Sequence, residues 1–165
     1  MSFKLIIDTG TWMKLGKLLH LNVIDERFID ELYNIAQVSI TPQIERELKQ
    51  HSVESWRKSK TYVIPVTNEK AYMRAINDEF DDADASIFGI QKKNEHLILT
   101  EDRPLLNYGK MYDLDFVFFI DFLSMLLETD LISKNELYTL NKALYALRNI
   151  NKYQHSRTKA FAQHY

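Results

Sequence analysis

Short apolar runs alternate with longer amphipathic segments along this 165-residue chain, and the alternation is its strongest constraint on fold. The runs are rich in β-branched and aromatic residues, which suits buried strands, whereas the segments between them space apolar residues at helical intervals. Strands separated by helices pair in parallel, because a parallel crossover needs a dozen or more residues. The pattern therefore predicts an α/β protein with a mainly parallel central sheet.

The expected elements can be given by residue range. Strands are predicted at 3–7, 38–40, 61–66, 96–100 and 116–120. The strand at 61–66 is expected at an edge, because it carries Pro65, and the strand at 116–120 is expected to be central. Helices are predicted from Thr11, at 25–36, from Pro42 after a Thr41 cap, and at 69–80, 82–93, 102–108, 122–127 and 134–147.

Composition narrows the class of protein. With 45% hydrophobic residues, the chain can bury one core, so we expect a single domain over 1–150. A basic tail is expected over 151–165, and a flexible tail is one interpretation of it. The net charge of −2 gives no whole-molecule attraction to nucleic acid. The absence of cysteine excludes disulfides and thiolate zinc sites. We also find no sequence pattern typical of a signal peptide or a membrane span, and both observations favour a cytoplasmic protein without a membrane partner.

Four acids stand at the edges of apolar runs. Asp8 and Asp102 follow predicted strands, Glu47 lies on a predicted helix, and Asp84 is at the start of another. Ligands in open parallel sheets bind beyond the carboxyl ends of the strands, where Asp8 and Asp102 are expected. A fold that gathers all four carboxylates would attract a divalent cation with a preference for oxygen ligands.

Each acid also has an ordinary explanation. Asp8 and Asp102 could simply cap the helices that follow them, since aspartate is a favoured N-cap residue. A single glutamate such as Glu47 on an amphipathic helix is usually a solvated surface residue. Asp84 belongs to a run of five acids over 78–84, which suits a hydrated helix N-terminus. Taken singly, none of the four identifies a site.

Taken together, four stretches resemble the acidic motifs of the PIN domain family, in matching order and with similar spacing over residues 3–120. They are IIDTG, TPQIEREL, DDADASIFGI and LILTEDRPL. The family pattern places its second acid directly before a leucine, which selects Glu47 over Glu45. Its third acid precedes a small residue and an apolar helix, which selects Asp84 over Asp81 and Asp82.

Two features depart from the family pattern. Gly89 stands where alanine is frequent, and the C-terminal region is longer than in compact toxins of the family.

The resemblance implies a three-layer α/β/α fold, here with extra C-terminal helices, and a metal-dependent endoribonuclease that uses Mg²⁺ or Mn²⁺ to hydrolyse RNA. Many members are toxins paired with an antitoxin protein, and others process ribosomal RNA without one. A catalytically silent module that binds RNA or protein is the alternative. The apolar residues Leu15, Leu18 and Leu19 and the stripe at 28–35 are expected to be core, with a homodimer or antitoxin surface as the other interpretation.

Roles follow from the implied chemistry, in which a hard cation activates water and offsets charge on the phosphate. Asp8 and Asp84 are the expected direct ligands, Asp102 a ligand or a holder of water on the ion, and Glu47 a ligand or a base. Three threonines, Thr9, Thr11 and Thr100, could orient these acids, although threonines at strand ends are usually local hydrogen-bonding groups.

The C-terminal region carries the predicted RNA contacts. After Glu136 there is no further acid, and five basic residues are candidates, namely Lys142, Arg148, Lys152, Arg157 and Lys159. A solvated terminus or a partner-docking segment is the competing interpretation.

Other phosphoryl-transfer folds fit less well. Gly10 occupies the place of the second aspartate of Asp-nucleophile phosphatases, the paired N-terminal acids of receiver domains are missing, and no glycine-rich phosphate loop is present.

Overall fold

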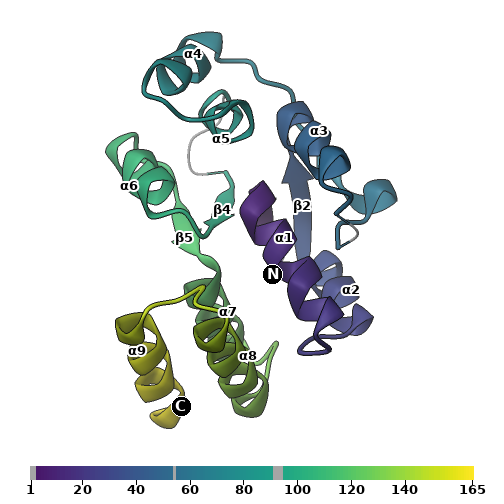
Figure 1. The fold of residues 1–165 in the computed structure, drawn as a ribbon, viewed down its shortest axis with the longest axis vertical. Coiled ribbons are helices and arrows are strands. Elements are labelled where there is room, and N and C mark those ends of the chain that lie inside the picture. The colour runs from purple at the N-terminus through teal and green to yellow at the C-terminus, as the bar shows by residue number, and fades with distance from the viewer. Residues whose placement is uncertain (1–2, 54, 91–94) are drawn as a thin grey trace. The chain divides into compact units, whose positions relative to one another are not determined.

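The computed structural model describes residues 3–53, 55–90 and 95–165 of the chain (Figure 1). The predicted α/β fold is confirmed: five strands form an all-parallel sheet in the order β3-β2-β1-β4-β5, consistent with a three-layer α/β/α arrangement. The chain divides into two compact units, one ending at Phe116 and the other spanning Val117–Tyr165, and each is described by itself.

The elements of the first unit, in chain order, are β1 (Phe3–Ile7), α1 (Thr9–His20), α2 (Glu26–Ile35), β2 (Ala36–Ile40), α3 (Pro42–Gln50), a 3₁₀ turn (Lys58–Lys60), β3 (Tyr62–Val63), α4 (Glu69–Asn77), α5 (Asp82–Phe88), β4 (Leu97–Thr100) and α6 (Arg103–Met111). Strand β5 (Phe116–Phe118) begins at the last residue of this unit. The second unit contains α7 (Phe119–Glu128), α8 (Lys134–Ala146) and α9 (Lys152–Gln163).

Strand β1 is the centre of the sheet. It pairs in parallel with β2, where Leu5 lies opposite Val38, and with β4, where Leu5 lies opposite Leu97. From β1 the chain builds outward to β2 and β3, then crosses back to place β4 on the other side of β1. The direction of growth therefore reverses between β1 and β4, and ligands in sheets of this kind bind in the crevice at such a switch point.

The core of the first unit explains the apolar residues of its first two helices. Leu15 and Leu18 of α1 and Ile29 of α2 are fully buried, and Leu32 is 3% exposed. These four residues are core, as expected, whereas Leu19, Phe28 and Ile35 of the same expectation are only half-buried.

The basic C-terminal region is a helix rather than a flexible tail. Asn151 begins α9 with a capping box, in which its side chain accepts from the Gln154 backbone and its own backbone donates to the Gln154 side chain. Helix α9 packs against α7 and α8 of the same unit. An ion pair between Arg157 and Asp121 joins α9 to α7.

Three predicted elements differ most from the structure. The strand expected to be central at 116–120 is β5, which lies at the edge of the sheet and gives way to α7 at Phe119. The strand expected at 61–66 has its predicted edge position, but only Tyr62 and Val63 pair. The helix expected over 82–93 ends at Phe88, and residues 91–93 of that expectation lie outside the described residues.

Among the helices that the structure describes, none has both the length and the apolar character needed to cross a membrane.

Candidate active site at the carboxyl ends of the strands

Asp8 is fixed at the start of α1, directly after the central strand. Its Oδ1 accepts from the Thr11 backbone N at 2.8 Å, which makes it the N-cap of the helix, and its Oδ2 accepts from Thr100 Oγ1 at 2.5 Å. The residue is 3% exposed, and burial raises the pKa of its carboxyl group, an effect that the hydrogen bonds from Thr100 and Thr11 oppose. Both carboxylate oxygens therefore have defined positions.

Thr100 links Asp8 to Asp102 across the switch point. Its hydroxyl donates to Asp8 and accepts from the Asp102 backbone N at 3.0 Å. Asp102 is exposed and caps α6, with Oδ1 accepting from Leu105 N at 2.9 Å. The two aspartates are helix caps, as their ordinary explanation predicts, and they are also joined through one threonine although 94 positions separate them in sequence.

A second link positions the helices that carry Glu47 and Asp84. Thr41 follows β2 and caps α3, and its hydroxyl lies 2.6 Å from Ser86 Oγ of α5, with both side chains fully buried. This contact holds α3 against α5, whose packing is visible in Figure 1. Glu47 and Asp84 are both half-buried on these helices.

The electrostatics of Asp84 relate it to the other three predicted acids. Burial raises the pKa of Asp84 to about 8, and so do four neighbouring carboxylates, in decreasing order Asp81, Asp8, Asp102 and Glu47. Like charges raise a carboxyl pKa only when they lie near enough to repel it. Asp8, Glu47 and Asp102 therefore each lie within electrostatic range of Asp84.

This gathering is looser than a preformed metal cage. Within 3–53, 55–90 and 95–165, no three acidic, histidine or cysteine side chains are arranged to hold one ion. Magnesium, however, usually keeps several waters and binds one or two protein carboxylates together with substrate phosphates. The donor chemistry fits such an ion, with oxygen ligands only and a surplus of negative charge.

Thr9 and Thr11 contribute differently. The hydroxyl of Thr11 donates to the Leu99 carbonyl at 3.5 Å, while the buried hydroxyl of Thr9 has no hydrogen-bond partner among the described residues. A buried hydroxyl without a partner costs free energy, and water or a ligand commonly satisfies such a group. Thr9 directly follows Asp8, so this hydroxyl without a partner lies at the start of α1.

The neighbouring acids have other partners. Glu45 pairs with Lys49 at 2.5 Å, and Asp82 contacts Arg46 and the hydroxyl of Tyr72. Asp81 caps α5. A hollow of about 250 Å³ lies beside Glu47 and is also lined by Arg46, Asp81 and Asp82. Glu45, Asp81 and Asp82 therefore have structural partners, which distinguishes them from the candidate site acids Glu47 and Asp84.

Sequence reasoning missed a buried ion pair next to Asp8. Lys14 Nζ of α1 lies 2.5 Å from Glu101 Oε2, with the two side chains 7% and 13% exposed. Burial lowers the pKa of Lys14, and the charges of Glu101 and Asp8 oppose this shift. One signal could have revealed it: Lys14 follows Thr11 by three residues and precedes Leu18 by four, so it falls on the buried face of the helix.

The predicted RNA contacts all lie in the second unit. Lys142 is on α8, Arg148 follows it, and Lys152, Arg157 and Lys159 are on α9. All five residues are exposed, but Arg157 is engaged by Asp121 and lies over the Tyr153 ring. The acids of the candidate site belong to the first unit.

Comparison with protein-family models gave no match, and neither the curated proteins nor the solved structures that were compared include a significant one.

Proposed function

We propose that this protein is a divalent-metal-dependent endoribonuclease that hydrolyses RNA phosphodiester bonds at Asp8, Glu47, Asp84 and Asp102. One observation carries the proposal: burial raises the pKa of Asp84 to about 8, and the carboxylates of Asp81, Asp8, Asp102 and Glu47 add to that shift from other parts of the first unit. Concentrated negative charge of this kind destabilises a fold unless a cation or a proton offsets it. Asp8 and Asp102 follow β1 and β4 at the switch point of the sheet, and sheets of this kind bind ligands there.

The residues of the chain have distinct tasks in this proposal. Asp8, fixed through both oxygens, and Asp84, whose charged form is opposed by burial and by neighbouring carboxylates, would hold Mg²⁺ or Mn²⁺, with Asp102 and Glu47 completing the acidic surround. When bound, the ion would activate water and offset the charge that develops on the phosphate. Thr100 orients Asp8 by donating to it, and the Lys14–Glu101 pair supports the same end of α1.

The test is cleavage of a mixed single-stranded RNA pool, with Mg²⁺ or Mn²⁺ and with chelator. Asp8→Asn and Asp84→Asn should lower the cleavage rate by about 100-fold or more, because removing even supporting groups of a metal site costs 10- to 100-fold. Metal-independent cleavage, or full activity in both variants, would overturn the proposal.

A matched pair on one helix sharpens the test. Glu47→Gln removes a carboxylate near Asp84, whereas Glu45→Gln removes one that pairs with Lys49 on the surface. The proposal requires a large loss of activity for the first variant and nearly normal activity for the second. Equal effects would show that any loss reflects the charge of α3 rather than a site.

A further inference from the structure

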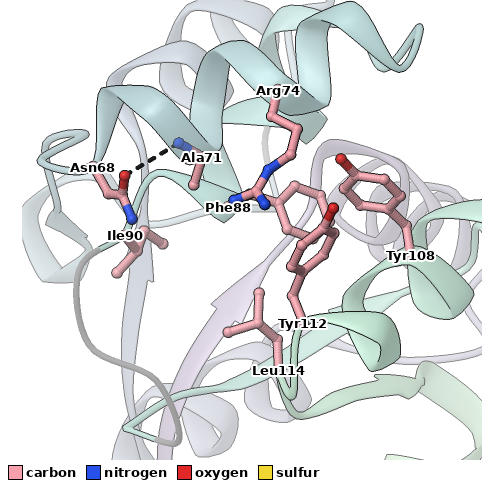
Figure 2. Close-up of a pocket in the computed structure, with 8 residues that line it drawn as sticks. All are labelled: Asn68, Ala71, Arg74, Phe88, Ile90, Tyr108, Tyr112 and Leu114. Atoms are coloured by element: carbon pink, nitrogen blue, oxygen red, sulfur yellow. Dashed lines mark hydrogen bonds between the residues drawn. The ribbon is translucent and has the colours of Figure 1, made fainter.

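A small aromatic pocket lies between α4 and α6 in the first unit, apart from the acidic site (Figure 2). Its volume is about 200 Å³, and its lining includes Asn68, Arg74, Phe88, Tyr108, Tyr112 and Leu114. Clefts that hold drug-sized ligands measure roughly 300–1,000 Å³, so this pocket suits one flat ring system rather than a whole cofactor.

An arginine and two mutually tilted tyrosine rings line the pocket. The guanidinium carbon of Arg74 lies 4.4 Å from the centre of the Tyr112 ring, and that ring lies 4.9 Å from Tyr108 (Figure 2). The hydroxyl of Tyr108 donates to Asp78 at 2.5 Å, which fixes its ring. Nucleobases stack both on aromatic side chains and on the plane of an arginine guanidinium. The arrangement presents such surfaces already in place.

The opposite wall is held rigidly. The Gly89 carbonyl accepts from the backbone N of Thr67 and of Asn68, each at 2.9 Å, which ties the start of α4 to the end of α5. A Cβ on Gly89 would lie 2.6 Å from Val66, so glycine permits this close approach. Packing therefore explains the departure from alanine at this position. The amide oxygen of Asn68 caps α4, and its NH₂ group supplies a donor at the pocket.

A purely structural aromatic cluster accounts for only part of this arrangement. Phe88 is buried and packs edge-on against Tyr108, as a core ring does. Arg74, however, is exposed, and Tyr112 is half-buried beside open space. A hydrophobic cluster does not need a cation over its outermost ring, whereas recognition of a base on a phosphate backbone uses both groups.

The pocket and the acidic site share two helices. Phe88 follows Asp84 by four residues on α5, a rise of about 6 Å, and Tyr108 follows Asp102 by six on α6, a rise of about 9 Å. A stacked strand advances about 3.4 Å per nucleotide. A strand held at the acids therefore reaches the pocket within about two or three nucleotides.

We propose that this pocket binds one unpaired base of the RNA strand held at the acidic site, stacked on the guanidinium of Arg74. The inference rests on the proposed ribonuclease function and adds a substrate preference to it: the strand must be single-stranded next to the cut. A base that stays paired in a duplex cannot enter the pocket, because it would first have to leave its own stack.

The experiment measures binding in chelator, so that it does not depend on cleavage. The probes are a short single-stranded RNA carrying a fluorescent adenine analogue and the same sequence as a duplex. Tyr112→Leu removes the ring and keeps an apolar side chain, and Arg74→Ala removes an exposed side chain. Tyr62→Leu and Arg27→Ala are matched controls, because Tyr62 is 60% exposed on β3 and the Arg27 side chain is 92% exposed on α2.

Both pocket variants should lose roughly 5- to 150-fold in affinity for the single strand, which corresponds to the stacking of one base. Tyr112→Leu should leave the salt dependence and duplex binding unchanged, and the controls should bind as the wild type does. Three results would overturn the proposed base pocket. They are unchanged single-strand affinity in both pocket variants, an equal loss of affinity for the duplex, and no binding of the single strand by the wild type. A wild type that binds in this way but never cleaves refutes the ribonuclease and leaves the pocket standing.

Discussion

Replacing Asp84 by asparagine should stabilise the metal-free protein, and the gain should grow as the pH rises. Asp84 has a pKa of about 8 in the folded chain and 3.8 as its ordinary value, so the folded state keeps a proton that the unfolded state releases. The resulting stability is fully present below about pH 4 and is lost as the pH rises toward 8. Asparagine does not titrate, so the variant escapes this loss.

The magnitude follows from the shift. Each unit of pKa corresponds to about 1.4 kcal/mol, so the unscreened effect at pH 8 would be roughly 5–6 kcal/mol. Asp84 is only half-buried, and water screens charges that it reaches. We therefore expect Asp84→Asn to raise the free energy of unfolding by about 1–3 kcal/mol at pH 8, and by much less near pH 4.

The assay is denaturant unfolding in chelator at both pH values, repeated with Mg²⁺. Mg²⁺ at about 100 times its dissociation constant should stabilise the wild type by about 2.7 kcal/mol and the variant by less. Added metal should therefore reduce, or reverse, the difference in stability between the variant and the wild type. Asp115→Asn, at an exposed aspartate of the same unit, should shift stability by less than about 0.5 kcal/mol at either pH. A variant no more stable than the wild type at pH 8 would show that burial and the neighbouring carboxylates do not oppose the charge of Asp84.

Three further substitutions test the packing and capping of the fold by thermal or denaturant unfolding. Gly16→Ala should stabilise α1 by about 0.5–1 kcal/mol, because an added Cβ would meet Ser55 at an ordinary 3.7 Å, and a loss instead would show that this part of α1 is tighter than described. Gly109→Ala makes the same change in α6 but would place the Cβ 2.1 Å from the Phe116 ring, so a cost of about 1–3 kcal/mol is expected, and a neutral result would contradict the close helix-to-strand contact. Ser133→Ala removes the capping box of α8 and should cost about 0.5–2 kcal/mol, whereas an unchanged midpoint would mean that this helix start is frayed in solution.

Local sequence signals predicted the fold where they were unambiguous. The run at 3–7 is a strand with the expected bounds, and Thr41 with Pro42 begins α3 through both the predicted cap and the predicted first turn. The signals failed where apolar residues run on without a break. Over 116–127 a short strand adjoins a largely buried helix, and periodicity alone cannot separate strand from helix in such an apolar run.

The candidate site was predictable for a different reason. Asp8 and Asp102 are marked by their position after apolar runs, and parallel topology then brings them to the same edge of the sheet. The partners of these acids were not predictable, because a sequence does not reveal which distant side chains meet. Lys14 finds Glu101 across 87 positions, and Thr41 finds Ser86 across 45. Both contacts depend on how helices pack on the sheet, which no local pattern encodes.

The four acids are not equivalent, and their differences indicate how the site would work. Asp8 is buried with both oxygens engaged, so its position is set before any ligand arrives. Asp84 is half-buried and is repelled by four neighbours, so its charge depends on what else is present. A site that combines a fixed carboxylate with one whose ionisation is opposed would gain stability from a bound cation. A metal-dependent gain in stability at pH 8 that is larger in the wild type than in Asp84→Asn is therefore the signature that distinguishes a metal site from a group of helix caps.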